Sequence, residues 1–343
     1  MATKATETTR TDGANGTTKS LLQAIGDGLA EEMRADDSVI ALGEDVGRAG
    51  GVFRVTQGLQ EEFGPLRVID TPLAESLIVG SAIGLSVNGM RPVAEIQFAD
   101  FIPPAFDQIV NEAALFYYRS GGAWPCPITI RVPYGAVPGG ALYHSQSVEA
   151  FFCNTPGLRV VAPSTPADAK GMLKSAIRDP NPVLFFEHKK VYRLVKEEVP
   201  DDAEPVPLDK ARVHREGSDL TVCAYGIVLH AALEVAEKLS AEHGIETEVI
   251  EPRTLYPLDR ETILASARKT GKFLAASEAN VTGSVSAEIA ALVADEAFEW
   301  LDAPVKRLGA PDVPVAGFAK PMLERLIPDA ADLEAAMLAL ARY

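Results

Sequence analysis

The sequence has little cysteine. Cys126, Cys153 and Cys223 are its three cysteines among 343 residues, and no two of them form a CxxC pair. The spacing therefore indicates neither a zinc site nor a disulfide framework. We expect the chain to work in the reducing environment of the cytoplasm.

The sequence is also short of basic charge. It has 32 Lys and Arg against 48 Asp and Glu, a formal net charge of −16 and a pI near 4.8. Nucleic acids and anionic membrane surfaces bind clustered Lys and Arg, so we expect no nucleic-acid partner and no membrane partner. No stretch approaches the roughly 20 apolar residues that a membrane helix needs.

Phosphate-binding motifs are missing as well. No GxGxxG follows an expected strand, and no GxxxxGK[ST] occurs. Gly26-Asp27-Gly28 resembles the start of a magnesium-diphosphate motif, but it lies within an expected helix, and residues 54–58 offer no Asn at the required distance. We interpret the triplet as a decoy. If the chain uses a phosphorylated cofactor, another chain must hold the phosphates.

Strands and helices alternate along the chain. Apolar residues at helical spacing over 19–33 precede a short apolar run at 39–42, and the same alternation continues to the C-terminal region. Further strands are expected at 67–69, 93–96, 127–132, 158–162, 183–186, 220–225, 246–250, 272–276 and 305–308, with helices at 74–87, 107–118, 167–177 and 228–239. This alternation predicts an α/β protein with doubly wound parallel sheets.

The chain is long enough for two domains. Residues 196–218 are acidic and contain prolines, which is typical of an exposed connection between domains. We expect a disordered tail at 1–17, because this segment is rich in Thr and lacks the apolar core of a secretory signal. The first domain is then expected at 18–203 and the second at 204–343.

Glu75 is the first candidate for chemistry. Thr71 and Pro72 predict a helix start, and the helix that follows is apolar nearly all round. Such a helix is expected to be buried, which would place the Glu75 carboxylate at least partly inside, where it needs a partner or a purpose. The alternative is a structural glutamate favoured by the helix dipole. The pattern alone leaves both open.

His144 is the second candidate. It lies in a glycine-entered polar loop after the expected strand at 127–132, and loops at that edge of an open α/β sheet bind ligands. The alternative is an ordinary loop histidine. We expect His188, His214, His230 and His243 at the surface.

Seven ordered segments resemble the beta subunits of 2-oxo acid dehydrogenases, which belong to the transketolase-like group. They are 42–46 (LGEDV), 70–75 (DTPLAE), 97–100 (QFAD), 106–108 (FDQ), 118–122 (YRSGG), 144–147 (HSQS) and 156–158 (PGL). The resemblance covers nearly everything from residue 20 onward. It implies a pyrimidine-binding domain followed by a transketolase C-terminal domain.

The resemblance also implies thiamine diphosphate as cofactor. The matching glutamate, Glu75, would hydrogen-bond the aminopyrimidine ring, a task that needs a carboxyl group able to share a proton. Phe101, Leu73 and Gln97 match other neighbours of that ring. His144 matches a histidine assigned to binding the substrate carboxylate or to proton transfer during acyl delivery.

The partners implied by the family are an alpha subunit, in an α2β2 heterotetramer, and a lipoyl-bearing acyltransferase. The alpha subunit would hold the diphosphate and Mg²⁺. Ser284 stands where relatives usually have a second glycine, within the domain implicated in docking to the acyltransferase. Some members also bind a potassium ion at positions that match Ile128, Thr129, Asp179 and Asn181.

The predicted reaction is decarboxylation of a 2-oxo acid and transfer of the acyl group to the lipoyl domain. Segments 94–100 (AEIQFAD) and 140–146 (GALYHSQ) are most similar to branched-chain members. Pyruvate and acetoin dehydrogenase beta subunits remain alternatives. A non-catalytic scaffold subunit and a self-sufficient enzyme that uses Gly26-Asp27-Gly28 are two further alternatives.

Overall fold

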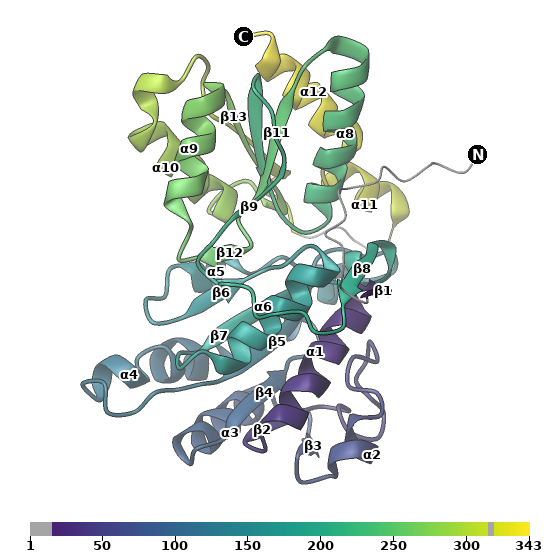
Figure 1. Cartoon of the computed structure of the whole chain (residues 1–343), viewed down its shortest axis with the longest axis vertical. Coiled ribbons are helices and arrows are strands. Elements are labelled where there is room, and N and C mark those ends of the chain that lie inside the picture. Colours follow the sequence, from purple (N-terminus) through teal and green to yellow (C-terminus); the bar gives the residue numbers. More distant parts are fainter. Residues whose placement is uncertain (1–15, 315–318) are drawn as a thin grey trace.

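Two α/β domains are stacked along the long axis of the molecule (Figure 1). The computed structural model describes residues 16–314 and 319–343. Most of the predicted tail, residues 1–15, lies outside this range. Gly16 and Thr17 were placed in the tail but belong to β1 (Gly16–Ser20), which pairs antiparallel with β8 (Lys196–Pro200). In the described part of the chain no helix has the length and apolar character to cross a bilayer.

Seven strands form the first sheet of the described chain, in the order β12-β6-β7-β5-β4-β2-β3. The first domain contributes six mutually parallel strands: β2 (Val39–Gly43), β3 (Val68–Asp70), β4 (Arg91–Glu95), β5 (Thr129–Tyr134), β6 (Arg159–Val161) and β7 (Val183–His188). The edge strand β12 (Thr254–Tyr256) comes from the C-terminal half and runs antiparallel to β6. The sheet is therefore mostly parallel and covered by helices, which confirms the predicted α/β fold class.

Helices cover both faces of this sheet (Figure 1). On one face, α1 (Leu21–Ala35), α6 (Pro166–Arg178) and α7 (Val191–Leu194) share an apolar core with the sheet, and α3 (Glu75–Val87) packs on the other face. The remaining helices are α2 (Leu59–Phe63), α4 (Phe116–Arg119) and α5 (Ala150–Cys153), with 3₁₀ turns at Ala99–Phe101, Pro103–Ala105 and Ala141–Tyr143. The predicted helix at 107–118 is divided into a π-helical segment, Gln108–Ala113, and α4.

The Gly26-Asp27-Gly28 triplet lies in the middle of α1, as predicted. A Cβ on Gly26 would lie 2.8 Å from the Val55 carbonyl oxygen, and one on Gly28 would lie 3.3 Å from the Lys170 carbonyl oxygen. Asp27 forms an ion pair with Lys19 at 2.6 Å. The two glycines thus allow close packing of α1, which agrees with the decoy interpretation.

The second domain has a five-stranded sheet among the described residues, in the order β14-β13-β10-β11-β9. Its strands are β9 (Arg212–Arg215), β10 (Leu220–Ala224), β11 (Thr247–Glu251), β13 (Phe273–Asn280) and β14 (Lys306–Ala310), and its helices are α8 (Ile227–His243), α9 (Arg260–Thr270), α10 (Val285–Glu296), α11 (Lys320–Leu326) and α12 (Ala330–Ala341), with a 3₁₀ turn at Phe298–Trp300. Only β9 is antiparallel to its neighbour. The expected connection at 196–218 is therefore partly regular structure, since it contains β8 and β9.

One apolar core runs from the first domain into the second. Ile130 and Phe186 of the first sheet belong to the same buried cluster as Ile263 of α9 and Ile289 of α10. The crossing of β12 onto the first sheet adds main-chain hydrogen bonds to this contact. The carboxyl edge of the first sheet is thus held against the second domain.

Candidate functional site

Four neighbouring parallel strands end at one edge of the first sheet, in the order β5-β4-β2-β3. The chain passes from β2 outward to β3 and then returns to the other side of β2 as β4. The crevice between β2 and β4 is therefore a topological switch point, where open α/β sheets bind ligands. Glu75 follows β3, Gln97 follows β4 and His144 follows β5. Three of the predicted site residues, which are far apart in the sequence, thus follow strands that end at the same edge of the sheet.

Glu75 is the first residue of α3 and is half-buried. The predicted start at Thr71 and Pro72 is wrong, because the Thr71 amide still donates to the Gly43 carbonyl at 2.9 Å and so continues the pairing of β3 with β2. Ala74 is the N-cap and offers no side-chain cap. A carboxylate at a helix N-terminus is stabilised by the helix dipole. Glu75 can therefore stabilise α3 and also have a chemical role.

Three carboxylates gather around this helix start. Burial raises the pKa of Glu44, and the charges of Asp45 and Glu75 raise it further. The Glu75 carboxylate makes no hydrogen bond or ion pair with any described residue, so it is free to accept a bond from a ligand. An acidic, partly desolvated strand edge of this kind suits a weakly basic ring nitrogen with which a carboxyl group can share a proton.

Aromatic rings line the crevice on the β4 side. The ring centroids of Phe98 and His144 lie 4.5 Å apart, those of Phe101 and His144 5.4 Å apart, and all three rings meet edge to face. Gln97 Nε2 donates weakly to the Glu44 carbonyl oxygen at 3.4 Å. Gln97 thus contacts the segment that follows β2, and Phe101 contacts the loop that carries His144.

The hydrogen bond of His144 sets its tautomer. Nδ1 lies 3.2 Å from the Gly140 carbonyl oxygen, and because a carbonyl only accepts, Nδ1 carries the proton and Nε2 is left for a ligand. Ala141 has φ +52°, a left-handed conformation that is uncommon for Ala. A Cβ on Gly140 would lie 2.4 Å from Ser145 Oγ. The loop is thus tightly folded around the histidine.

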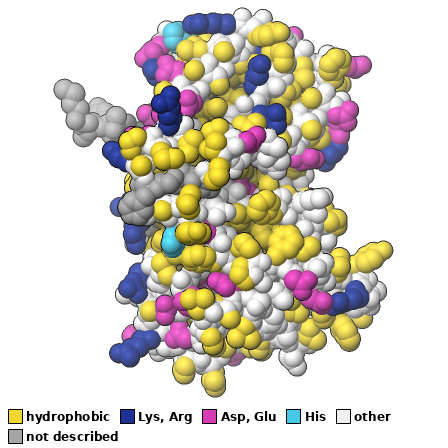
Figure 2. Space-filling model, turned by 180° about the vertical axis from the view of Figure 1, so that it is seen from behind, with side chains coloured by type: hydrophobic (Ala, Val, Ile, Leu, Met, Phe, Trp, Pro, Cys, Tyr) yellow, Lys and Arg dark blue, Asp and Glu magenta, His cyan; other side chains and the backbone are white. Residues whose placement is uncertain are grey.

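The surface beside Glu75 is apolar and open. The prediction that α3 is buried all round is wrong: Ile78, Val79 and Ala82 are buried, whereas Leu77 and Val87 are exposed, and the neighbouring Leu73 is 70% exposed. Figure 2 shows hydrophobic side chains over the middle and the lower, N-terminal half of one face. Large apolar side chains exposed in the first domain also include Phe106, Tyr117, Tyr118, Trp124, Leu142, Tyr143 and Phe151. Exposed apolar surface on this scale indicates a protein partner.

Arg131 joins the strands beneath the site. This fully buried guanidinium from β5 forms two hydrogen bonds of 2.7 Å to Glu187 of β7 and a third to Glu95 of β4, and Tyr192 donates to Glu187. Burial alone would lower the pKa of Arg131, but the two carboxylates raise it, and burial raises the pKa of Glu95. Sequence reasoning missed this network, because the three strands are far apart in the chain.

The remaining histidines only partly follow the prediction of surface positions. His243 is exposed, whereas His188 is buried, with Nε2 3.1 Å from Glu278 Oε2 of the second domain. His214 lies 2.7 Å from a Glu251 carboxylate oxygen, and His230 donates to the Ser164 carbonyl at 2.8 Å. Their carboxylate and carbonyl partners at the domain boundary explain why these three are withdrawn from solvent.

The residues of the predicted potassium site lie side by side. The Val183 amide donates to the Ile128 carbonyl at 2.9 Å, and the Cys126 amide donates to the Pro180 carbonyl at 3.1 Å, so the segment of Ile128 and Thr129 contacts the segment of Asp179 and Asn181. Asp179 Oδ1 accepts two bonds from Asn181, and Oδ2 lies 2.8 Å from Arg159 Nε. The Asp179 carboxylate therefore already has partners for both of its oxygens. A potassium ion at this place would have to bind mainly to main-chain oxygens.

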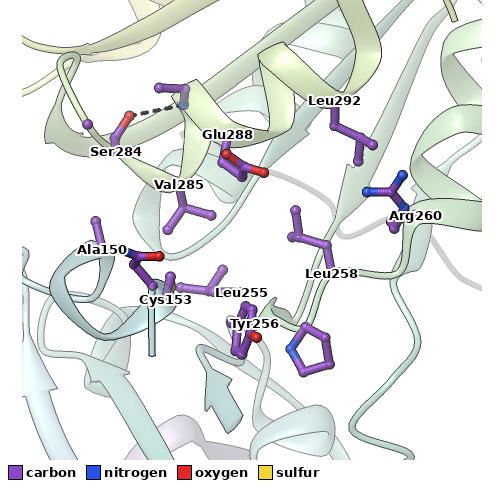
Figure 3. Close-up of a pocket in the computed structure, with 14 residues that line it drawn as sticks. Ala150, Cys153, Leu255, Tyr256, Leu258, Arg260, Ser284, Val285, Glu288 and Leu292 are labelled. Atoms are coloured by element: carbon purple, nitrogen blue, oxygen red, sulfur yellow. Dashed lines mark hydrogen bonds between the residues drawn. The ribbon is translucent and has the colours of Figure 1, made fainter. Parts of the chain in front are cut away.

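Two further features lie away from Glu75 and His144. A cavity of about 560 Å³ between the domains is lined by Ala150 and Cys153 of α5, by the turn before α9, and by Ser284 and Glu288 at the start of α10 (Figure 3). Asp168, His214 and Glu251 offer ligand atoms within 4.8 Å of one another. Asp168 also forms ion pairs of 2.8 and 2.9 Å with Arg212 and Arg253, and these cations oppose a metal ion at that cluster.

Known proteins resemble this chain over almost its full length. Residues 18–195 match the family described as "Transketolase, pyrimidine binding domain", and residues 209–333 match "Transketolase, C-terminal domain". The chain is 53% identical to the 2-oxoisovalerate dehydrogenase subunit beta of Bacillus subtilis (strain 168), over 94% of this chain and 99% of the relative. It is 48% identical to the pyruvate dehydrogenase E1 component subunit beta of the same organism, over 85% and 90%.

A solved structure has the same arrangement of domains. It is a split-gene transketolase, an inactive beta4 tetramer, with a TM-score of 0.77 and 27% identity over 94% of this chain and 98% of that chain. The match spans both domains, so the similarity includes their mutual placement.

Replacing Arg131 tests the network beneath the site. We expect Arg131→Met to lower the free energy of unfolding by about 3–5 kcal/mol, because Glu95 and Glu187 would stay buried without their cation. Chemical denaturation of the full chain measures this. Arg193→Met is the control, since Arg193 is exposed and pairs with no described acidic residue. Equal denaturation midpoints for the two variants would contradict the assignment.

Proposed function

Because this chain belongs to the family of 2-oxo acid dehydrogenase beta subunits, with transketolase-like domains, we propose that it decarboxylates a branched-chain 2-oxo acid together with an alpha subunit. The observation that supports the proposal is that Glu75, Gln97 and His144 follow neighbouring strands that end at one switch-point edge, with Phe101 in contact with His144. The higher identity to the 2-oxoisovalerate relative than to the pyruvate relative supports the choice of substrate.

The residue types at this edge suit the aminopyrimidine half of thiamine diphosphate. The unpaired carboxylate of Glu75 and the aromatic rings of Phe101 and His144 are of the kind that such a ring needs. Leu73 lies two residues before Glu75, and Gln97 bonds the Glu44 carbonyl at the end of β2. When bound, thiamine diphosphate supplies the electron sink for loss of carbon dioxide from a 2-oxo acid. We assign cofactor binding to Glu75, Leu73, Gln97 and Phe101.

Glu75 and His144 are the proposed catalytic residues. The Glu75 carboxyl group would share a proton with the ring nitrogen of a bound aminopyrimidine. His144 keeps Nε2 free for a ligand, because Nδ1 is bound to the Gly140 carbonyl. A protonated Nε2 can bind the substrate carboxylate, and it can deliver its proton during acyl transfer.

The partner in this proposal is an alpha subunit that completes the site. The sequence lacks a phosphate-binding motif, and the crevice opens onto the exposed apolar surface of α3 and its neighbours. An α2β2 heterotetramer in which the alpha subunit holds the diphosphate and Mg²⁺ accounts for both features. We further propose that the acyl acceptor is a lipoyl-bearing acyltransferase and that the complex is cytoplasmic, in keeping with three cysteines that form no disulfide.

A potassium ion bound through main-chain oxygens near Ile128, Thr129, Asp179 and Asn181 is also proposed. It would tie the loop before β5 to the loop before β7. Equal melting temperatures in potassium and sodium buffers would contradict it.

Substrate choice is tested on the reconstituted heterotetramer. We expect 2-oxoisovalerate to have a larger kcat/KM than pyruvate in an assay of reductive acylation of a lipoyl domain. A larger kcat/KM for pyruvate, or turnover of acetoin alone, would overturn the branched-chain assignment while leaving the family unchanged.

The Glu75→Gln variant tests the chemistry of the crevice. An amide cannot share a proton as a carboxyl group does, so we expect kcat to fall by about 10²–10⁴-fold in the heterotetramer. Glu61→Gln, on the exposed side of α2, is the matched control and should keep the wild-type kcat. Unaltered turnover by the Glu75 variant would instead favour a scaffold subunit.

A further inference from the structure

Lys189 is a buried lysine next to the candidate site. It follows His188 at the end of β7, and it is 6% exposed. Its Nζ has no hydrogen-bond partner within residues 16–314 and 319–343. It lies 5.4 Å from the centroid of Phe98, the ring that also contacts His144. A buried ammonium without a hydrogen bond is unfavourable, so its presence calls for an explanation.

Two carboxylates face this amine from different elements. Burial lowers the pKa of Lys189 to about 8, and the charges of Asp100, from the 3₁₀ turn after β4, and of Glu278, from β13 of the second domain, oppose that shift. His188 bonds Glu278 on its other side, and His144 lies across the Phe98 ring. Lys189 is thus positioned as a shared counter-charge for two carboxylates from separate domains.

The same two carboxylates hold the segment that carries His144. Asp100 Oδ1 accepts hydrogen bonds from the main-chain amides of Ser145 and Gln146, at 3.1 and 3.2 Å. Glu278 Oε1 accepts one from the amide of Ala136, ten residues earlier. The segment 136–146 is therefore fixed near both ends, by Asp100 beside the histidine and by Glu278 at its start.

We infer that Lys189 is a positioning residue, whose buried ammonium holds the Asp100 and Glu278 side chains in place so that segment 136–146 presents His144 to the candidate site. It acts through these carboxylates and does not itself touch the substrate. The catalytic consequence rests on the proposed function, whereas the effect on the segment does not.

The effect of Lys189 on stability depends on pH. Because folding lowers the pKa of the amine to about 8, from 10.5 in the unfolded chain, the folded state disfavours the ammonium. That destabilisation is fully present below about pH 8 and disappears as the pH rises through 10.5. At pH 7 the Lys189→Met chain loses this penalty and also loses the counter-charge of Asp100 and Glu278. Its melting temperature is therefore measured beside its activity, and the activities are compared at a temperature at which both chains are folded.

The experiment uses the heterotetramer with Lys189→Met, Lys189→Arg and the control Lys190→Met, since Lys190 is adjacent but exposed. Lys189→Met should lower kcat at least 10-fold with little change in KM, and Lys189→Arg should restore most of it. The wild type should lose activity as the pH rises through about 8, and Lys189→Arg should keep its activity there, because a guanidinium stays charged.

Hydrogen exchange gives a measurement that needs no activity. The amides of Ala136, Ser145 and Gln146 should exchange faster in Lys189→Met than in Lys190→Met. In turnover, Lys189→Met combined with His144→Ala should be no slower than His144→Ala alone, because the two residues act in one chain of contacts.

Unchanged exchange in Lys189→Met overturns the inference, and so does a double variant in which the two losses multiply. A wild-type tetramer that turns over no 2-oxo acid would instead count against the proposed function, and the exchange rates would still decide the role of Lys189.

Discussion

The buried Arg131 guanidinium holds together three strands, and residues of the candidate site follow directly after these strands. Glu95 of β4 stands two residues before Gln97, Glu187 of β7 stands two residues before Lys189, and β5, which carries Arg131, leads into the His144 loop. A parallel sheet fixes which strand ends lie side by side, and the bonds of one buried guanidinium fix their relative height. This network therefore fixes the relative positions of the residues at the candidate site, although Arg131, Glu95 and Glu187 are themselves buried beneath it.

The second domain packs against only part of the carboxyl edge of the first sheet, so the rest of that edge remains open. The second domain covers part of that edge through a shared apolar core and through Glu278, which bonds His188 and the Ala136 amide. The β3 side, with Leu73 and the outer face of α3, stays open. A chain built in this way offers half of a cofactor site and the surface on which a second subunit can complete it.

Periodicity and motif order predicted the succession of strands and helices along the chain. They also predicted that Glu75 and His144 each follow a strand. They placed α3 at 74–87, within one residue of its observed start, but the start signal at Thr71 and Pro72 was misleading, because the pairing of Thr71 with β2 overrides a good capping sequence. They also missed β12, which leaves the second domain to pair with β6, and the burial of His188, whose partner Glu278 is 90 residues away. Contacts of this kind depend on how two domains meet, and local pattern carries no information about that.

The central claim is that this chain holds only the aminopyrimidine half of the cofactor site. Isothermal titration of thiamine diphosphate with Mg²⁺ into this chain alone, and into the chain co-purified with its alpha subunit, tests it most directly. The account predicts saturable binding to the pair and none to the chain alone. Tight, magnesium-dependent binding to the chain alone would contradict it.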